Sequence, residues 1–350
     1  MKFFARVWRR CTLNENSEAM ILIDALYINM GGGLGLLRYL VETLQEKKVD
    51  FFLLADARVG DEFMDLPHVE HVSASLSHRK GFYKKQRGEF TSVLCFGNVP
   101  PPEKLKVPVY TYFHNVNMLT LADCYSKKQW LLFLLKRAYI RFMRGHTDEW
   151  FVQTDNTANE VIRHLGVPAE KVKIFPFYKR PHLHNTDYKR TDYIFAGDNT
   201  GSKGHEELLK AWRLLHEQGF DRYLHLTVSM GDALLNRLEE AVNAGVKIVN
   251  HGFIPTEELS VLYQQSKATV YPSYNESFGL GLVEAMEAGC DVIASDRPFV
   301  YSICEPSEVF DPKTPQFIAD AVLRYETGQS RKTKQRVKNR IDEMINRIES

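Results

Sequence analysis

One stretch of the sequence, Tyr271 to Gly289, combines the end of a strand, a polar loop and a helix. Residues 268–271 are rich in β-formers and predict a strand that stops at Pro272. The loop leads into a helix whose C-cap we expect at Gly289. The first amides of a helix are unpaired and its dipole favours negative charge, so a loop of small residues before it is a ready anion site.

Two carboxylates frame this site, Glu276 in the loop and Glu284 in the second turn of the helix, with seven residues between them. The whole string resembles the donor-site signature of the retaining GT-B glycosyltransferases, the "group 1" or family 4 class, which use nucleotide-activated sugars. The resemblance implies that Glu276 contacts the transferring sugar and is catalytic, and that Glu284 binds the ribose. It also implies donor binding by the segment between them, Ser277, Phe278, Gly279, Leu280 and Gly281. A lone pair of glutamates would instead be read as a solvated helix face.

Glycines are concentrated after the first expected strand, which begins at Met20. The segment Asn29–Gly35 precedes a helical pattern of leucines, so strand, glycine loop and helix form half of a βαβ unit. The family resemblance implies that Gly32 and Gly33 approach the donor phosphates and the acceptor from across a cleft. The alternative is a tight turn that needs a positive φ.

His114 lies at the C-terminal end of another expected strand, which begins at Val107. Ligands of doubly wound sheets bind beyond such strand ends. The resemblance places a catalytic histidine over the transferring sugar here, whereas a lone histidine is more often structural.

A second βα pattern begins at Asp192 and continues through Gly197 to Lys203-Gly204. The resemblance implies donor binding at Gly197 and makes Lys203 a catalytic cation that binds the diphosphate. The position where relatives carry an arginine holds Asp198. Either Asp198 turns away and caps the loop, or another cation, Lys189 or Arg190, replaces the arginine; we favour the first. By the same resemblance, a nucleobase loop comprises Gly252, Phe253 and Ile254.

Two segments of the N-terminal half are basic and contain aromatic or apolar residues. Residues 78–87 could meet an anionic acceptor or a membrane surface, or form a solvated face. Residues 127–144 form an apolar helix with basic ends, either a buried core helix or an interfacial helix on anionic lipid.

With 350 residues the chain is long for a single core, so we expect two domains. We assign 1–19 to a peripheral segment, 20–180 to an acceptor domain, 181–330 to a donor domain and 331–350 to a C-terminal helix that packs across the junction. A net charge of +1 argues against a nucleic-acid binder, and five scattered cysteines suit a reducing compartment. No apolar run approaches the roughly 20 residues of a membrane span.

We therefore predict an α/β protein of GT-B architecture, with two Rossmann-like domains that face a cleft. The resemblance implies transfer of a hexose, with retention, from a UDP- or GDP-linked sugar to a glycan or lipid-linked acceptor in surface polysaccharide or glycolipid synthesis. We expect a cytoplasmic protein, peripheral on the membrane if at all, with no cofactor and no metal. The alternatives are a nucleotide-sugar epimerase or hydrolase, and a non-enzymatic nucleotide-binding homologue.

Overall fold

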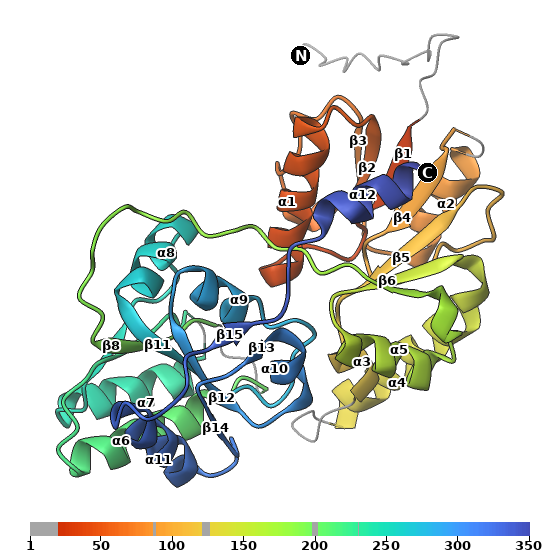
Figure 1. Ribbon diagram of the computed structural model, residues 1–350. Coiled ribbons are helices and arrows are strands. Elements are labelled where there is room, and N and C mark those ends of the chain that lie inside the picture. The colour runs from red at the N-terminus through yellow and green to blue at the C-terminus, as the bar shows by residue number, and fades with distance from the viewer. Residues whose placement is uncertain (1–19, 87–88, 121–126, 198–201, 230) are drawn as a thin grey trace, which may run out of the picture.

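The structure is a computed structural model that describes residues 20–86, 89–120, 127–197, 202–229 and 231–350. Two domains lie side by side, each with a central sheet between layers of helices (Figure 1). All strand pairs within the two large sheets are parallel. The predicted α/β class with two doubly wound domains is confirmed.

The N-terminal domain contains a seven-stranded sheet of order β3-β2-β1-β4-β5-β6-β7. Its strands are short apolar runs, because parallel strands covered by helices are buried on both faces. They are β1 Ile21–Asp24, β2 Phe51–Asp56, β3 Val69–Val72, β4 Ser92–Cys95, β5 Val109–Phe113, β6 Glu149–Val152 and β7 Val172–Ile174. Its helices are α1 Gly31–Glu46, α2 Leu76–Lys85, α3 Asn117–Thr120, α4 Lys127–Met143 and α5 Asp155–Leu165, with 3-10 turns η1 Ala57–Val59, η2 Arg144–His146 and η3 Ala169–Lys171.

The C-terminal domain repeats this design with a six-stranded sheet of order β10-β9-β8-β11-β12-β14. The strands of this domain are β8 Asp192–Phe195, β9 Leu224–Leu226, β10 Ile248–Asn250, β11 Ser266–Tyr271, β12 Asp291–Ser295 and β14 Glu308–Phe310, and the separate pair β13 Cys304–Glu305 and β15 Lys334–Gln335 is antiparallel. Its helices are α6 His205–Glu217, α7 Asp232–Asn243, α8 Thr256–Gln265, α9 Leu280–Glu287, α10 Pro298–Ile303 and α11 Pro315–Glu326.

Each sheet has a point where the strand order reverses. In the N-terminal domain β1 lies between β2 and β4, and in the C-terminal domain β8 lies between β9 and β11. Doubly wound sheets bind ligands in the crevice beyond the strand ends at such points. Loops that follow β1, β4 and β5 line one cavity together with loops that follow β8, β9, β10 and β11, so the two crevices meet.

The chain crosses between the domains twice. Residues 175–191 form an extended connection, and the end of the chain returns as α12 Ile341–Glu349 on the N-terminal domain (Figure 1). The buried side of α12 joins the core formed by β1, β2 and α1 through Ile341, Met344, Ile345 and Ile348. The helix expected over 331–350 is therefore too long: residues 334–335 form β15 instead, and the side chain of Asn339 accepts a hydrogen bond from the Ile341 amide at the start of the helix.

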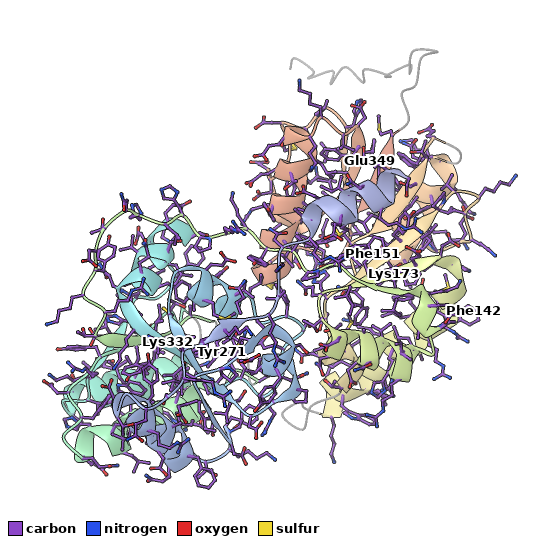
Figure 2. The ribbon with its side chains drawn as sticks, in the orientation of Figure 1. Phe142, Phe151, Lys173, Tyr271, Lys332 and Glu349 are labelled. Carbon is purple, nitrogen blue, oxygen red and sulfur yellow. The ribbon has the colours of Figure 1, made fainter. Side chains whose placement is uncertain are left out.

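Helix α4 is not the fully buried core helix that was one interpretation of residues 127–144. Ile140 and Met143 are buried, but Leu135 is 61% exposed and Phe142 is 82% exposed. Figure 2 shows Phe142 at the outer edge of the N-terminal domain, on the side away from the C-terminal domain. No helix in the described ranges is both long and apolar enough to cross a bilayer.

The basic segment 78–87 corresponds largely to α2, and its residues divide between core and surface. Arg79 is 1% exposed and donates to the Asp24 carboxylate at 2.8 Å, so it cannot meet an external anion. Lys80, Lys84 and Lys85 are exposed.

Candidate active site

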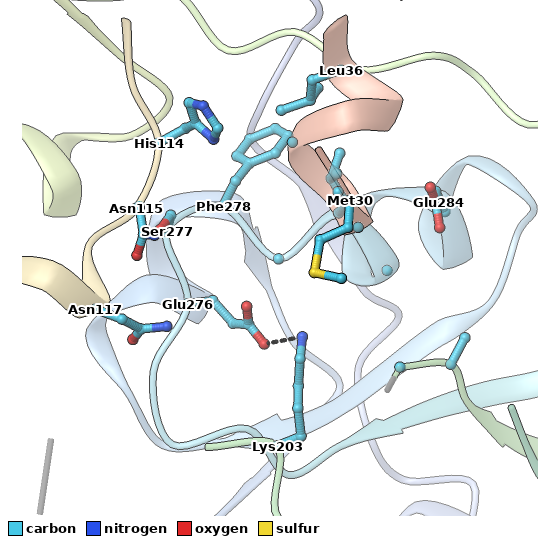
Figure 3. A pocket seen from close by; sticks show the side chains of 18 of the residues that line it. Met30, Leu36, His114, Asn115, Asn117, Lys203, Glu276, Ser277, Phe278 and Glu284 are labelled. Atoms are coloured by element: carbon cyan, nitrogen blue, oxygen red, sulfur yellow. Dashed lines mark hydrogen bonds and ion pairs between the residues drawn. The ribbon is translucent and has the colours of Figure 1, made fainter. Parts of the chain in front are cut away.

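A cavity of about 640 Å³ separates the two domains (Figure 3). Every described side chain or glycine that the sequence singled out for the site lines this cavity. These residues are Gly32, Gly33, His114, Gly197, Lys203, Gly252, Phe253, Ile254, Glu276, Ser277, Phe278, Gly279, Leu280, Gly281 and Glu284. Asp198 lies outside the described residues, as does the peripheral segment 1–19.

Two helix N-termini meet at the cavity, that of α1 from one domain and that of α9 from the other. The residues before them, Met30 and Gly279, make no side-chain cap, so the first amides are available to a ligand. A Cβ on Gly32 would lie 3.1 Å from Leu280 Cδ1, so the two helix ends approach each other closely at this glycine. Both helix dipoles therefore favour an anion at the junction of the domains.

Lys203 supplies a cation beside these helix ends. Its Nζ lies 2.6 Å from Glu276 Oε1, which also accepts a hydrogen bond of 3.3 Å from the Tyr271 hydroxyl. The next residue, Gly204, has φ +71, and a Cβ there would lie 2.5 Å from the Pro272 carbonyl oxygen. Glycine at 204 thus lets the lysine loop lie directly against the loop after β11.

Glu284 projects from α9 into the cavity (Figure 3). Burial raises its pKa to about 7, and the nearby Lys203 ammonium partly opposes that rise. No side chain or amide in the described part of the chain hydrogen-bonds this carboxylate. A half-buried acceptor without a protein partner fits a ligand that brings hydroxyl donors.

His114 is held in a fixed orientation at the end of β5. Its Nε2 lies 3.0 Å from the Phe96 carbonyl oxygen, and its ring stacks on Phe96 with centroids 5.1 Å apart. Burial lowers the pKa of His114 to about 4, so the imidazole is neutral near pH 7. The same Nε2 also lies 3.4 Å from Asn98 Nδ2. In the tautomer that donates from Nε2 to the Phe96 carbonyl, Nδ1 is the acceptor.

Ser277 lines the cavity, but its polar groups form hydrogen bonds with the N-terminal domain. The Val116 amide donates to Ser277 Oγ at 2.7 Å, and the Thr157 hydroxyl donates to the Ser277 carbonyl at 2.9 Å. Beside it, Asn275 Nδ2 donates to Asn117 Oδ1 at 3.0 Å and to Thr120 Oγ1 at 2.9 Å. We call these contacts of Asn275 and Ser277 with the N-terminal domain the Asn275–Ser277 latch. Sequence reasoning missed them because the partners are distant in the chain.

Arg190 does not replace the arginine that the family pattern lacks here. Its guanidinium donates to the Ala288 carbonyl at 2.7 Å, at the C-terminal end of α9 and thus opposite the helix end that lines the cavity. Within the described residues, no group of three His, Cys, Asp or Glu side chains could hold a metal ion. Independence from metal remains a prediction.

Comparison with known proteins agrees with this geometry. Residues 178–344, just under half of the chain, match the family model "Glycosyl transferases group 1". O-antigen chain mannosyltransferase B of Escherichia coli is 26% identical over 223 residues, covering 56% of this chain and 54% of that protein. The serotype-specific mannosyltransferase WbdA of Escherichia coli is 32% identical over 134 residues, covering 37% of this chain and 16% of that protein. The chain thus spans about half or less of the length of these relatives.

Solved structures extend the likeness to both domains. A sucrose-phosphate synthase from Thermosynechococcus elongatus superposes with TM-score 0.67 at 17% identity, over 89% of this chain and 90% of that chain. The apo form of the lipopolysaccharide outer core galactosyltransferase WaaB superposes with TM-score 0.64 at 14% identity, over 95% of both chains. The predicted GT-B architecture is confirmed.

Proposed function

We propose that this protein is a glycosyltransferase that moves a hexose from a nucleoside diphosphate sugar to a glycan or lipid-linked acceptor. The observation that carries the proposal is the meeting of two uncapped helix N-termini and Lys203 at one cavity between the domains. The family model over residues 178–344 supports the same reaction class. Because O-antigen mannosyltransferases are among the similar proteins, we propose mannose as the first sugar to test and O-antigen-like polysaccharide as the product class.

The chemistry follows from where charge develops. Cleavage of the bond between sugar and diphosphate leaves negative charge on the leaving phosphate. The amides of Leu280 and Gly281, the dipole of α9 and the Lys203 ammonium are preorganised to stabilise that charge. We assign the diphosphate to this end of the cavity and the ribose to Glu284, whose carboxylate can accept two hydroxyl hydrogen bonds.

We place the transferring sugar between Glu276 and His114, which line the same cavity from opposite domains. Neutral His114 can accept a hydrogen bond from a sugar hydroxyl through Nδ1 without adding charge. We propose that the sugar is transferred with retention of configuration, as the resemblance implies, and that the leaving phosphate takes the acceptor proton.

We further propose that the enzyme acts at an anionic membrane face. The exposed side of α4 carries Leu131, Leu135 and Phe142, at spacings that share one helix face. Exposed lysines and arginines flank this stripe, and residues 127–143 contain no Asp or Glu. An apolar stripe with basic flanks suits a helix that lies in the headgroup region.

The test is turnover of nucleotide sugars with and without a polysaccharide or glycolipid acceptor fraction. Release of nucleoside diphosphate that depends on the acceptor, with the sugar recovered on the acceptor, is the expected result. Conversion of the donor without any acceptor would instead support the epimerase or hydrolase alternative. A binding screen precedes it, since a ligand at about 100 times its Kd adds about 2.7 kcal/mol to the stability of the folded state.

A further inference from the structure

A row of hydrogen-bonding side chains follows the strand ends of the N-terminal sheet that face the cavity between the domains. Continuing the register of β4, β5 and β6 beyond their last pairs aligns Asn98, His114 and Gln153, one residue after the end of each of β5 and β6 and three after β4. All three residues line the cavity. Gln153 carries no sequence signature, and only the pairing of β5 with β6 brings it level with His114.

Gln153 differs from the other two residues of this row in its hydrogen bonds. Asn98 Oδ1 accepts a hydrogen bond of 2.7 Å from the His114 amide, and His114 Nε2 lies 3.0 Å from the Phe96 carbonyl oxygen. The Gln153 side chain is only 2% exposed, yet its Nε2 has no hydrogen-bond partner among the residues that the structure describes. A buried amide donor without a partner destabilises a folded protein, and a ligand in the cavity can supply the missing acceptor.

Gln153 also lies close to the loop of the other domain that carries Glu276. The residue after it, Thr154, caps α5 and donates from its hydroxyl to the Ser277 carbonyl oxygen at 3.4 Å. Gln153 is thus flanked by His114 in its own sheet and by the segment Glu276-Ser277 across the cavity. The proposed function places the transferring sugar between His114 and Glu276, within reach of this unpaired donor.

We propose that Gln153 is a specificity-determining residue, which donates a hydrogen bond from Nε2 to one hydroxyl oxygen of the transferring sugar. The assignment deepens the proposed glycosyl transfer and rests on it for the presence of a sugar. A hexose in which that hydroxyl is missing, or has the opposite configuration, leaves Nε2 buried and unpaired in the complex. A site built to hydrogen-bond one hydroxyl rejects ligands without it more strongly than an apolar pocket can reject them by shape.

A purely structural role for Gln153 would have a different signature, which Gln264 on α8 illustrates. Gln264 is 6% exposed, its Oε1 accepts from the His184 amide at 2.8 Å, and its Nε2 donates to the His184 carbonyl oxygen at 2.9 Å. Replacing Gln264 with methionine, a side chain of similar size, breaks both hydrogen bonds. The same replacement at Gln153 removes an unpaired donor, so the two substitutions should change stability differently.

The test compares the wild type, Gln153→Met and Gln264→Met by urea denaturation and by calorimetric titration. The ligands are GDP, UDP, their mannose, glucose and galactose conjugates, and analogues of the conjugate that the wild type binds most tightly, each lacking one sugar hydroxyl. Gln153→Met should unfold at the same urea concentration as the wild type or a higher one, and Gln264→Met at a lower one.

For the sugars, we expect one deoxy analogue to bind the wild type about tenfold more weakly than its parent conjugate. Gln153→Met should bind the parent about tenfold more weakly than the wild type does, and should bind parent and analogue equally. Gln264→Met should keep the preference of the wild type. Affinity for the free nucleoside diphosphate should be the same in all three proteins.

The remaining outcomes separate this assignment from the proposed function. The sugar contact is overturned if Gln153→Met discriminates the analogues as the wild type does, or if it loses stability as Gln264→Met does. A loss of affinity for the free nucleoside diphosphate equal to the loss for the parent conjugate also overturns it, because the amide would then act on the nucleotide. In each of these cases the wild type still binds nucleotide sugar and the proposed function stands. A wild type that binds no nucleotide and no conjugate overturns the proposed function, and the sugar contact with it.

Discussion

Lys203 and Glu276 form an ion pair of 2.6 Å in the cavity between the domains, with both side chains largely shielded from solvent. The pair joins the loop before α6 to the loop after β11, so two of the loops that line the cavity hold each other in place. A bound diphosphate would offer the lysine a second anionic partner. Glu276 would then be released to accept hydrogen bonds from the sugar.

The first prediction is that Lys203→Ala weakens binding of a nucleoside diphosphate sugar by a factor of about ten, equal to about 1.4 kcal/mol. The cause is loss of the only cation that the described residues place in the lining of this cavity. Isothermal calorimetry measures the effect, and Lys80→Ala is the surface control. Normal donor affinity in Lys203→Ala would favour a non-enzymatic homologue.

Glu276→Ala should keep nucleotide affinity and lower turnover.

The second prediction concerns pH and Glu284. If its carboxylate holds the ribose, donor affinity should fall as pH drops below about 7, where the buried carboxyl gains a proton. His114, with its pKa lowered to about 4, stays neutral through this range and does not contribute to the pH dependence of donor affinity. Titration with a nucleotide sugar, whose diphosphate keeps its charge from pH 6 to pH 8, measures the effect. Glu284→Ala should bind nucleotide and nucleotide sugar weakly at every pH, and unchanged affinity would refute the ribose assignment.

The raised pKa of Glu284 can also be tested without a ligand, by measuring how the stability of the fold depends on pH. The folded state binds the Glu284 proton more tightly than the unfolded state, so the stability from this group is complete below about pH 4.5 and is lost as pH rises through about 7. Glu284→Gln has no such loss. We therefore expect the difference in free energy of unfolding, Glu284→Gln minus wild type, to rise by about 1–3 kcal/mol between pH 5 and pH 8.

Much of the fold could be predicted because buried parallel strands appear in the sequence as continuous apolar runs. The run that ends at Tyr271 and the run that starts at Asp291 correspond to β11 and β12 almost residue for residue. The site residues could be named because the string from Glu276 to Glu284 resembles a family signature, and because helix N-termini and strand ends are marked locally by glycines and small polar loops. Their assembly into one cavity followed from the doubly wound topology.

What could not be predicted depends on contacts between segments far apart in the chain. Arg79 stands in a basic segment, and only the position of β1 shows that it is buried on Asp24. The exposed stripe of α4 was ambiguous because apolar residues occur nearly all round the helix, and periodicity alone does not show which side is covered. The Asn275–Ser277 latch required knowing where α3 and α5 stand relative to the other domain.

The third prediction is that Ser277→Ala loosens the domain junction. The substitution removes the acceptor of the Val116 amide, and a lost hydrogen bond of this kind costs about 1 kcal/mol. We expect small-angle scattering to report a larger radius of gyration for the ligand-free Ser277→Ala, Asn275→Ala double variant than for the wild type. Nucleoside diphosphate affinity should change little, because the α9 amides and Glu284 remain. Identical scattering curves would show that the latch does not hold the domains together.

The fourth prediction is that Arg79→Met destabilises the N-terminal domain by about 3–5 kcal/mol, because it leaves the Asp24 carboxylate buried without its cation. Arg79 also donates to the carbonyls of Val99 and Pro100, each at 2.8 Å, so its loss frees two further acceptors. Urea denaturation followed by circular dichroism measures the change. Lys80→Met, one residue away and exposed, should stay within about 0.5 kcal/mol of the wild type. An Arg79→Met protein as stable as wild type would refute a stabilising role for the buried Arg79–Asp24 pair.

The fifth prediction is that the protein sediments with vesicles of anionic lipid at low salt, and much less at high salt. Basic residues beside an anionic surface contribute about 1 kcal/mol each, and salt screens that attraction. Phe142, 82% exposed on α4, would add apolar contact with the bilayer. Phe142→Asp should reduce the bound fraction at every salt concentration, whereas the Lys127→Gln, Lys128→Gln double variant should mainly flatten the salt dependence.

Phe317→Asp is the matched control for that experiment, because Phe317 is a 50% exposed phenylalanine on α11 of the other domain. If membrane binding is specific to the α4 stripe, Phe317→Asp sediments like the wild type while Phe142→Asp remains in solution. Equal losses in both variants would indicate that exposed aromatic residues bind lipid wherever they lie on the surface. Complete absence of co-sedimentation at low salt would refute the membrane contact and favour an acceptor that diffuses freely in solution.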